Sequence, residues 1–418
     1  MLHTQKSLCY RETPDHQRTR GKVCVNTMAS SSSSSSSVPL SKANITFCLD
    51  LFQKLNDNNE TANIFFSPFS ISSALAMVTL GARGNTAKQI SECLKTQDCQ
   101  DEVHTGFAQL LSELNKADAP YALSVANRLY GEQSFQFIED FLTQTRTHYN
   151  AELEAVDFKT SSEAARVKIN NWVEEKTKGK IKDIVAEGTV DRMTRLVLVN
   201  ALYFKGTWNK TFNCARTEDA DFKLNKRETK LVKMMTQDAY FPLRFIPEID
   251  CQILEMPYKE KELSMLIFLP KEIQDDTTGL EKLEKQLTYE KFVEWTRPDM
   301  MPEAKVDVSL PRFKMEETYN LNNVLKNMGI VDAFDAMKSD FSGMSEARDL
   351  FLSKVSHKAF VEVNEEGTEA AAATAVFCQV LSACLYRTYF TADHPFLFFI
   401  RHNPTMSVLF AGRFCSPV

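Results

Sequence analysis

Long apolar runs and an excess of basic residues are both missing from this sequence. No uninterrupted apolar segment approaches the roughly 20 residues that a membrane-spanning helix needs, and the longest candidate, residues 395–400, fits a buried strand. The net charge of −6 gives no bulk attraction to nucleic acid or to an anionic membrane. We therefore expect neither a nucleic acid nor a membrane as a partner.

Cysteine is too sparse for a disulfide framework. The 10 cysteines among 418 residues include no Cys-x-x-Cys pair, so free thiols in a reducing compartment are the preferred interpretation. Residues 1–27 carry scattered basic side chains without an apolar centre, so they do not resemble a secretory signal. We expect a cytoplasmic protein, with non-classical release from cells as an added route to the outside.

The short motifs of several enzyme classes are absent as well. The sequence has no His-Glu-x-x-His metal motif, no Gly-x-x-x-x-Gly-Lys phosphate loop and no Gly-x-Ser-x-Gly nucleophile turn. We therefore expect no metal, no cofactor and no catalytic residue. Ser67 and His357 could suggest a hydrolase, but Ser67 is fixed in front of Pro68, which disfavours a nucleophile.

A run of serines divides the chain into two parts. Ser30 to Ser37 cannot bury a core, so residues 1–37 are expected to form a disordered N-terminal extension. Met28 stands just before this run and is an alternative start, which the sequence does not decide. Residues 38–418 are expected to form one large domain, and 43% of the whole chain is apolar, which suits a large core.

Hydrophobic periodicity predicts an α+β protein with one large mixed domain. Apolar residues recur every three or four positions over 40–55, 70–80 and 163–177, which predicts helices. Residues 196–204 are almost continuously apolar, so they should form a strand that is buried on both faces. Further strands are predicted at 264–269, 305–310, 360–363, 395–400 and 407–410.

One segment does not fit the rest of this pattern. Residues 364–393 connect two convincing strands, and structureless connections of this length are usually functional or disordered. After Gly367 the segment consists almost entirely of small residues, and from Val376 it turns apolar. A short helix capped by Thr368 is one interpretation, because alanine favours helices. The other is a loop that later enters a sheet, with Gly367 as a flexible pivot.

The alternation of side chains supports the second interpretation. In an extended strand one face would carry only small or apolar residues and could be buried. The opposite face could remain partly solvated. The first face consists of Thr368, Ala370, Ala372, Thr374, Val376 and Cys378, and the second of Glu369, Ala371, Ala373, Ala375, Phe377 and Gln379.

Several motifs together resemble the serpin family, in particular its ovalbumin-type intracellular branch. Residues 364–374 resemble the hinge of inhibitory serpins, and residues 390–400 resemble the signature that follows their reactive loop. Residues 63–71, 198–208 and 310–313 match further family motifs, and the likeness extends from about residue 38 to 417. The resemblance implies the serpin fold, with a large mixed central sheet, further sheets, about nine helices and an exposed reactive loop at about 364–390.

The resemblance also implies a function, that of a serine protease inhibitor acting as a suicide substrate rather than an enzyme. Counting fourteen positions from Gly367, as in inhibitory relatives, places the reactive bond at Leu381-Ser382, with Val380 and Ser382 as alternative registers for the bait residue. An apolar bait suits chymotrypsin-like and elastase-like proteases. The implied hinge comprises Glu366, Gly367, Thr368, Glu369, Ala370, Ala371, Ala372 and Ala373.

A second set of residues follows from the same resemblance. Ser67, Ser70, Asn200 and His357 are expected to form a buried hydrogen-bond cluster where the central sheet opens, with Trp208 near the top of that opening. We expect a monomer whose partners are serine proteases. A non-inhibitory serpin and a cross-class inhibitor of cysteine proteases are the alternatives, and the small residues of the hinge favour the inhibitory role.

Overall fold

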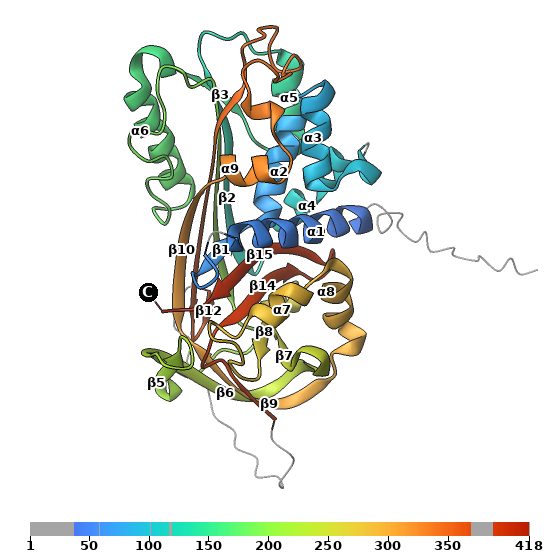
Figure 1. Ribbon diagram of the computed structural model, residues 1–418, viewed down its shortest axis with the longest axis vertical. Coiled ribbons are helices and arrows are strands. Elements are labelled where there is room, and N and C mark those ends of the chain that lie inside the picture. Colours follow the sequence, from blue (N-terminus) through green and yellow to red (C-terminus); the bar gives the residue numbers. More distant parts are fainter. Residues whose placement is uncertain (1–36, 58, 101, 117–118, 369–387, 418) are drawn as a thin grey trace, which may run out of the picture. The chain divides into compact units, whose positions relative to one another are not determined.

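The computed structural model describes residues 37–417 except 58, 101, 117–118 and 369–387 (Figure 1). Nine α-helices lie in this part of the chain, and no helix within it is both long and apolar enough to cross a membrane. The helices are α1 (Ser37–Asn56), α2 (Pro68–Thr79), α3 (Gly84–Leu94), α4 (Val103–Leu114), α5 (Glu139–Tyr149), α6 (Phe158–Lys176), α7 (Glu281–Gln286), α8 (Tyr289–Trp295) and α9 (Asn322–Asn327).

One sheet runs along the length of the domain and is called here the lengthwise sheet (Figure 1). Its order is β10-β11-β12-β4-β2-β3, with direct pairing between β11 and β4 as well. The β11–β4 and β2–β3 ladders are parallel, and the others are antiparallel. The strands are β2 (Tyr121–Glu132), β3 (Leu153–Val156), β4 (Leu196–Thr207), β10 (Phe313–Asn320), β11 (Leu352–Asn364) and β12 (Gly367–Thr368).

Part of a nine-stranded sheet lies beside the lengthwise sheet, and the rest lies across its lower end in Figure 1. Its order is β1-β15-β14-β8-β7-β6-β9-β13, and β5 pairs with β6. The strands are β1 (Ile64–Phe66), β5 (Glu218–Lys223), β6 (Thr229–Ile246), β7 (Cys251–Pro257), β8 (Leu263–Pro270), β9 (Glu303–Pro311), β13 (Thr388–Thr391), β14 (Phe396–His402) and β15 (Ser407–Phe414).

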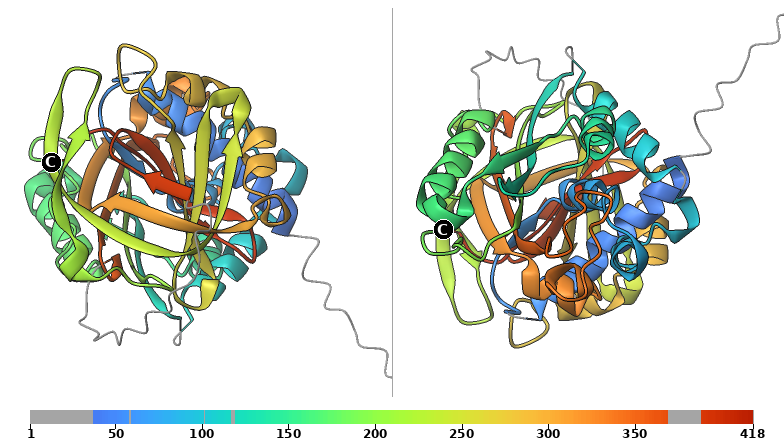
Figure 2. Two further views of the ribbon diagram at one scale, coloured as in Figure 1. Left: turned by 90° about the horizontal axis from the view of Figure 1, so that it is seen from below. Right: turned by 90° about the horizontal axis from the view of Figure 1, so that it is seen from above.

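Strand β4 separates two apolar cores, which explains its continuous apolar sequence. Leu198 and Leu202 point into the main core, while Val199 and Ala201 point into a smaller core on the other face. Helix α6 covers the smaller core through Ile169. Both views in Figure 2 place α6 and α1 on opposite sides of this sheet. The predicted burial of residues 196–204 on both faces is therefore confirmed.

Local sequence signals explain where the second helix begins. Ser67 is the N-cap of α2, and its Oγ accepts a hydrogen bond from the backbone N–H of Ser70 at 3.1 Å. Pro68 occupies the first helical position, where the missing N–H costs nothing.

The six cysteines in the described residues are free thiols, in agreement with the expectation from their spacing.

Candidate functional site

The structure brings four of the predicted residues into one buried hydrogen-bond cluster, called here the β4–β11 cluster: Ser67, Ser70, Asn200 and His357. The backbone N–H of Ser67 donates to Nε2 of His357 at 3.1 Å, and Ser67 Oγ donates to the carbonyl of Leu409 at 2.6 Å. Asn200 Nδ2 donates to Ser70 Oγ at 2.6 Å, and Asn200 Oδ1 contacts His357 Nδ1. All four residues are almost completely buried. The cluster therefore ties α2 to both parallel strands at the centre of the sheet.

The hydrogen bonds define the protonation state of His357. Its Nε2 accepts from a backbone N–H, so the proton of the neutral ring lies on Nδ1 and is donated to Asn200 Oδ1. Burial lowers the pKa of His357 to about 3. A second proton would have to sit on Nε2, where it would face the Ser67 N–H. The ring is therefore held neutral, as a connector rather than a general acid.

Sequence reasoning missed two members of this region, Asn127 and Tyr319. The register places Asn127, Asn200, His357 and Tyr319 in one row across β2, β4, β11 and β10. Asn127 Oδ1 accepts from Asn200 Nδ2, and the Tyr319 ring is nearly parallel to the His357 ring at a centroid distance of 6.3 Å. No local motif marks either residue. Only the pairing of distant strands places them beside His357.

Removal of the His357 ring should weaken the closed sheet. In the His357→Ala variant, the Ser67 N–H and Asn200 Oδ1 lose their partner in a buried site, and the ring leaves a cavity. We expect a loss of about 2–4 kcal/mol in native-state stability and faster polymer formation on warming. Size-exclusion chromatography of heated samples measures the polymer. His357→Gln, which offers one donor and one acceptor, is the control and should remain closer to wild type. A fully inhibitory His357→Ala monomer would contradict this role.

The lowered pKa of His357 predicts that the protein loses stability in acid. Its folded pKa of about 3 lies below the unfolded value of about 6.5, so the unfolded chain binds the extra proton first as the pH falls. Stability is retained above pH 6.5 and falls between 6.5 and 3, by about 1.4 kcal/mol per pH unit from this one group. His104 and His402, whose pKa values burial lowers to about 4, act in the same direction. Thermal midpoints should therefore depend less steeply on pH in His357→Gln than in wild type; equal slopes would rule His357 out.

The root of the candidate loop is held by a clamp at the end of β4. The backbone N–H of Trp208 donates to the carbonyl of Glu366 at 2.7 Å, and its indole Nε1 donates to the carbonyl of Asn364 at 3.0 Å. Phe212 N–H donates to the carbonyl of Glu365 at 2.7 Å. The Trp208 ring stacks on Tyr258, with centroids 4.6 Å apart. Trp208 thus lies at the end of β4, where β12 separates β4 from β11.

Gly367 enters the lengthwise sheet between β11 and β4. It pairs with Asn364 on β11 and with Thr207 on β4, and Thr368 follows in the same register. Its φ of +142° is unfavourable for residues with a side chain, and a Cβ here would lie 2.1 Å from the carbonyl oxygen of Gly206. Only glycine fits this position, because the neighbouring backbone occupies the space that a side chain needs.

Gly367→Ala should therefore detach β12 from its neighbours. We expect amide protection in residues 363–368 to fall at least about tenfold, since the strained backbone costs about 1–3 kcal/mol. Hydrogen–deuterium exchange measures this directly. Gly179→Ala is the matched control, because Gly179 also has a positive φ of 76° but has nothing within 4 Å of the added Cβ. Unchanged exchange in Gly367→Ala would show that the pairing of β12 does not depend on glycine.

The remaining predicted site residues lie outside the described residues. These are Glu369, Ala370, Ala371, Ala372 and Ala373 of the hinge, and the bait residues Leu381 and Ser382. The roles assigned to them stay predictions. On the far side of the loop, the chain resumes at β13, which pairs in parallel with β9 from Thr388 to Thr391.

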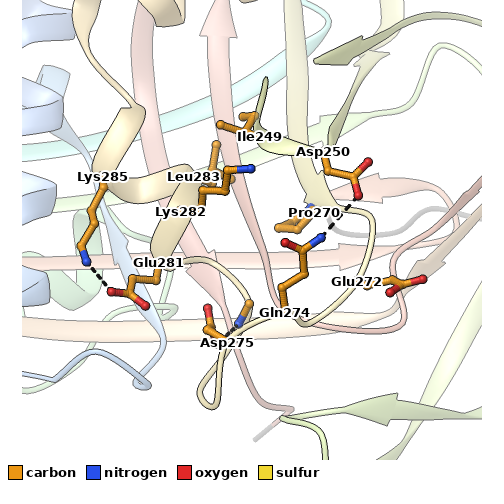
Figure 3. A pocket seen from close by; sticks show the side chains of 11 residues that line it. Ile249, Asp250, Pro270, Glu272, Gln274, Asp275, Glu281, Lys282, Leu283 and Lys285 are labelled. Atoms are coloured by element: carbon orange, nitrogen blue, oxygen red, sulfur yellow. Dashed lines mark hydrogen bonds and ion pairs between the residues drawn. The ribbon is translucent and has the colours of Figure 1, made fainter. Parts of the chain in front are cut away.

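A pocket of about 260 Å³ lies away from this region, beside α7 (Figure 3). Four of its polar side chains form two pairs: Lys285 with Glu281, and Gln274 with Asp250 at 3.4 Å. Within the described ranges no group of three His, Cys, Asp or Glu side chains could hold a metal ion. The pocket therefore gives no chemistry that would compete with the β4–β11 cluster and the loop root.

Comparisons with known proteins agree with this geometry. The family model for serpins (serine protease inhibitors) matches residues 42–417. Leukocyte elastase inhibitor from Equus caballus is 54% identical over 378 residues, which are 90% of this chain and 99% of the relative. The protein of the same name from Homo sapiens is 54% identical over 381 residues, with the same shares.

Solved structures show the same fold. A crystal structure of maspin superposes with a TM-score of 0.84 at 38% identity, covering 91% of this chain and 100% of maspin. Uncleaved ovalbumin superposes with a TM-score of 0.83 at 38% identity, covering 90% of this chain and 100% of its own. The fold and the branch expected from the sequence motifs are therefore confirmed.

Proposed function

The chain belongs to the serpin family of serine protease inhibitors, and from this premise we propose that it traps chymotrypsin-like or elastase-like proteases by loop insertion. The protease serine would attack the carbonyl carbon of Leu381, and the peptide bond to Ser382 would break. The new amine leaves with a proton, and an ester joins Leu381 to the protease. The cut loop would then enter the lengthwise sheet, with the protease attached, before water can release it.

The observation that carries this proposal is the position of β12. Gly367 and Thr368 already occupy the space between β11 and β4 and pair with both strands in antiparallel register. Below them, β11 and β4 pair directly with each other from Leu352 to Phe360. The loop root therefore stands at the entrance of a gap that would open if these two parallel strands separated.

Continuation of this register predicts the environment of each inserted residue. Ala370 would lie between Phe204 and Val361, which both face the main core. Ala371 would lie between Tyr203 and Phe360, which face the smaller core beneath α6. The face that the sequence makes small and apolar is thus the face that would enter the main core. This agreement supports insertion and disfavours a permanent helix in the alanine run.

The same register assigns a role to Thr374. It would arrive between Asn200 and His357, the pair whose contact closes the sheet. Its hydroxyl can both donate and accept, so it could replace the partner that each of them loses. The hydroxyl of Thr374 would therefore meet the polar row across the sheet. Ala370 and Ala372, the two positions before it on the same face, would meet only apolar side chains.

The identity of the bait residue supports the choice of target. A leucine at position 381, preceded by Val380, suits the apolar primary pockets of chymotrypsin-like and elastase-like enzymes. A trypsin-like target is disfavoured because the first basic residue after the hinge is Arg387. We also propose a cytoplasmic monomer, which the free thiols of the described residues support.

Neutrophil elastase, cathepsin G and chymotrypsin test the proposal. Each is mixed with the protein, and the products are separated by denaturing electrophoresis. We expect a complex that survives SDS with at least one enzyme, and a released C-terminal peptide that begins at Ser382 in mass spectra. A protease with its serine chemically blocked is the control and should form no such complex. Clean cleavage without complex by all three enzymes would favour the non-inhibitory alternative, and trapping of a cysteine protease alone would favour the cross-class alternative.

A further inference from the structure

We propose that a pocket at the junction of β6 and β7, called here the β6 pocket, binds a small amphipathic organic anion that slows movement of the loop root. The pocket has a volume of about 710 Å³. The pocket lies where β6 changes its partner strand. β6 pairs with β7 from Ile246 to Leu243, and with β9 from Pro242 back to Met234. Ala239 of β6 is one of the residues that line the pocket.

The charged side chains at the floor of the β6 pocket already have ion-pair and hydrogen-bond partners. Arg401 and Glu255 form a buried ion pair of 3.2 Å, and Arg401 also donates to the carbonyl of Thr296 at 3.0 Å and to Asn403 Oδ1 at 3.0 Å. Burial would make an unpaired guanidinium costly, so this pair is not available to a ligand. The side chains at the rim of the pocket must therefore be the ones that bind the ligand.

The rim carries three lysines, Lys210, Lys261 and Lys305, against two carboxylates, Asp238 and Glu303. Lys210 Nζ donates to a backbone carbonyl, that of Asp238, at 2.6 Å. The Asp238 carboxylate is already paired with Arg216 at 3.1 Å, and Lys305 lies 4.0 Å from it. For Lys210 and Lys261, no carboxylate among the described residues lies within 4 Å. A ligand anion could therefore pair with either lysine without displacing an existing ion pair.

Apolar groups border the same lysines. Phe241 is buried at the pocket wall, Pro242 and Met406 are half-buried, and Tyr240 is 65% exposed. A flat apolar body could rest against these side chains while its anionic group reaches Lys210 or Lys261. A small aromatic carboxylate or sulfonate requires an apolar wall and nearby cations that are not already in a close ion pair, and this pocket offers both.

Lys210 connects the β6 pocket to the loop root. It lies between Trp208 and Phe212, whose backbone N–H groups hold the carbonyls of Glu366 and Glu365 at 2.7 Å. On the pocket side, the Lys210 carbonyl accepts from Gln237 Nε2 at 3.3 Å. Asn209 N–H also donates to the carbonyl of Pro257 at 2.9 Å. Residues 208–212 are thus fastened to β6 and β7 on one side and to the hinge on the other.

The direction of the effect follows from this connection. When β4 separates from β11, residues 208–212 must shift with the end of β4, and the pocket wall formed by Asn209 and Lys210 shifts with them. A ligand that bridges Lys210 and the β6 wall binds the closed sheet better than the opening one. It therefore slows insertion, and more of the loop is cleaved without trapping. The kinetic part of the inference rests on the proposed inhibitory function, whereas the binding part does not.

Binding is tested first, without any protease. The probe is 8-anilinonaphthalene-1-sulfonate, titrated by fluorescence into the intact protein. We expect one saturable site that weakens about tenfold in the double variant Lys210→Gln, Lys261→Gln. Ala239→Trp should abolish it by filling the pocket. The control pair Lys226→Gln, Lys338→Gln neutralises two exposed lysines elsewhere and should bind as wild type does. Unchanged affinity in the double variant would overturn the proposal, whatever the behaviour of Ala239→Trp.

The regulatory effect is tested with a protease that forms the complex. With the β6 pocket saturated, we expect the ratio of cleaved protein to SDS-stable complex to rise about threefold in wild type and to stay constant in the double variant. A small chromogenic substrate checks that the probe leaves the protease active. An unchanged ratio at full occupancy would overturn the regulatory claim. If the ligand-free protein forms no complex with any protease, the proposed function has failed, and the binding result stands by itself.

Discussion

Ala370→Glu is expected to convert the inhibitor into a substrate. In the register set by β12, position 370 would lie between Phe204 and Val361, and both side chains are fully buried in the main core. Insertion would bury a carboxylate without a partner, which costs several kcal/mol. Loop cleavage should proceed as before, but the yield of SDS-stable complex should fall about 100-fold. Electrophoresis of timed mixtures with chymotrypsin measures both products.

The neighbouring position provides the matched control. Position 369 would lie between Lys205 and Glu362, which are both half-buried, so it should tolerate charge. Glu369→Lys should therefore keep most of the trapping activity. The contrast separates the effect of the buried face from that of any charge in the hinge. If both variants trap equally well, the inserted strand does not follow the register of Gly367 and Thr368.

Leu381→Arg should move inhibition from chymotrypsin-like to trypsin-like proteases. An arginine cannot be neutralised in an apolar primary pocket, whereas a trypsin-like pocket supplies a carboxylate at its base. We expect the association rate with chymotrypsin to fall at least about 100-fold and an SDS-stable complex with trypsin to appear, because a buried unpaired charge costs several kcal/mol. Second-order rate constants for both enzymes measure the change.

Three further variants locate the bait bond. Leu381→Met keeps an apolar bait and should retain the original targets. Val380→Arg and Ser382→Arg move the charge to the two alternative registers, and neither should trap trypsin as well as Leu381→Arg does. If Leu381→Arg keeps its original target range while one of these two gains trypsin, the bait residue is the neighbour and the count from Gly367 is off by one.

The fold could be predicted where burial is continuous or strictly periodic. Residues 196–204 form most of β4, and residues 305–310 lie within β9, where buried side chains alternate with exposed or half-buried ones. The 18-residue strand β6 was not predicted. It pairs with β5, then with β9 and then with β7 along its length. Its buried and exposed side chains therefore do not alternate with a single period of two.

Part of the candidate site could likewise be predicted from the sequence, and part could not. Ser67, Ser70, Asn200 and His357 were identified by family resemblance, and the structure places them within hydrogen-bond distance of one another. Asn127 could not be found, because its contact with Asn200 depends on the register of β2 against β4. Pairing across more than 70 intervening residues leaves no signal in a local window. The clamp formed by Trp208 and Phe212 also escaped prediction, since two backbone N–H groups and one indole N–H donate to carbonyls far along the chain.

If the loop inserts as proposed, the direct parallel pairing of β11 with β4 limits the lifetime of the native molecule. An inserted loop would exchange this one parallel ladder for two antiparallel ladders, and parallel pairing is slightly weaker per residue. The described arrangement is then protected by a barrier rather than by equilibrium. Storage losses should accelerate with temperature as a rate does, and an apparent melting point should depend on how fast the sample is heated. Under the proposed mechanism each molecule would be used once, so the supply of inhibitor would depend on new synthesis.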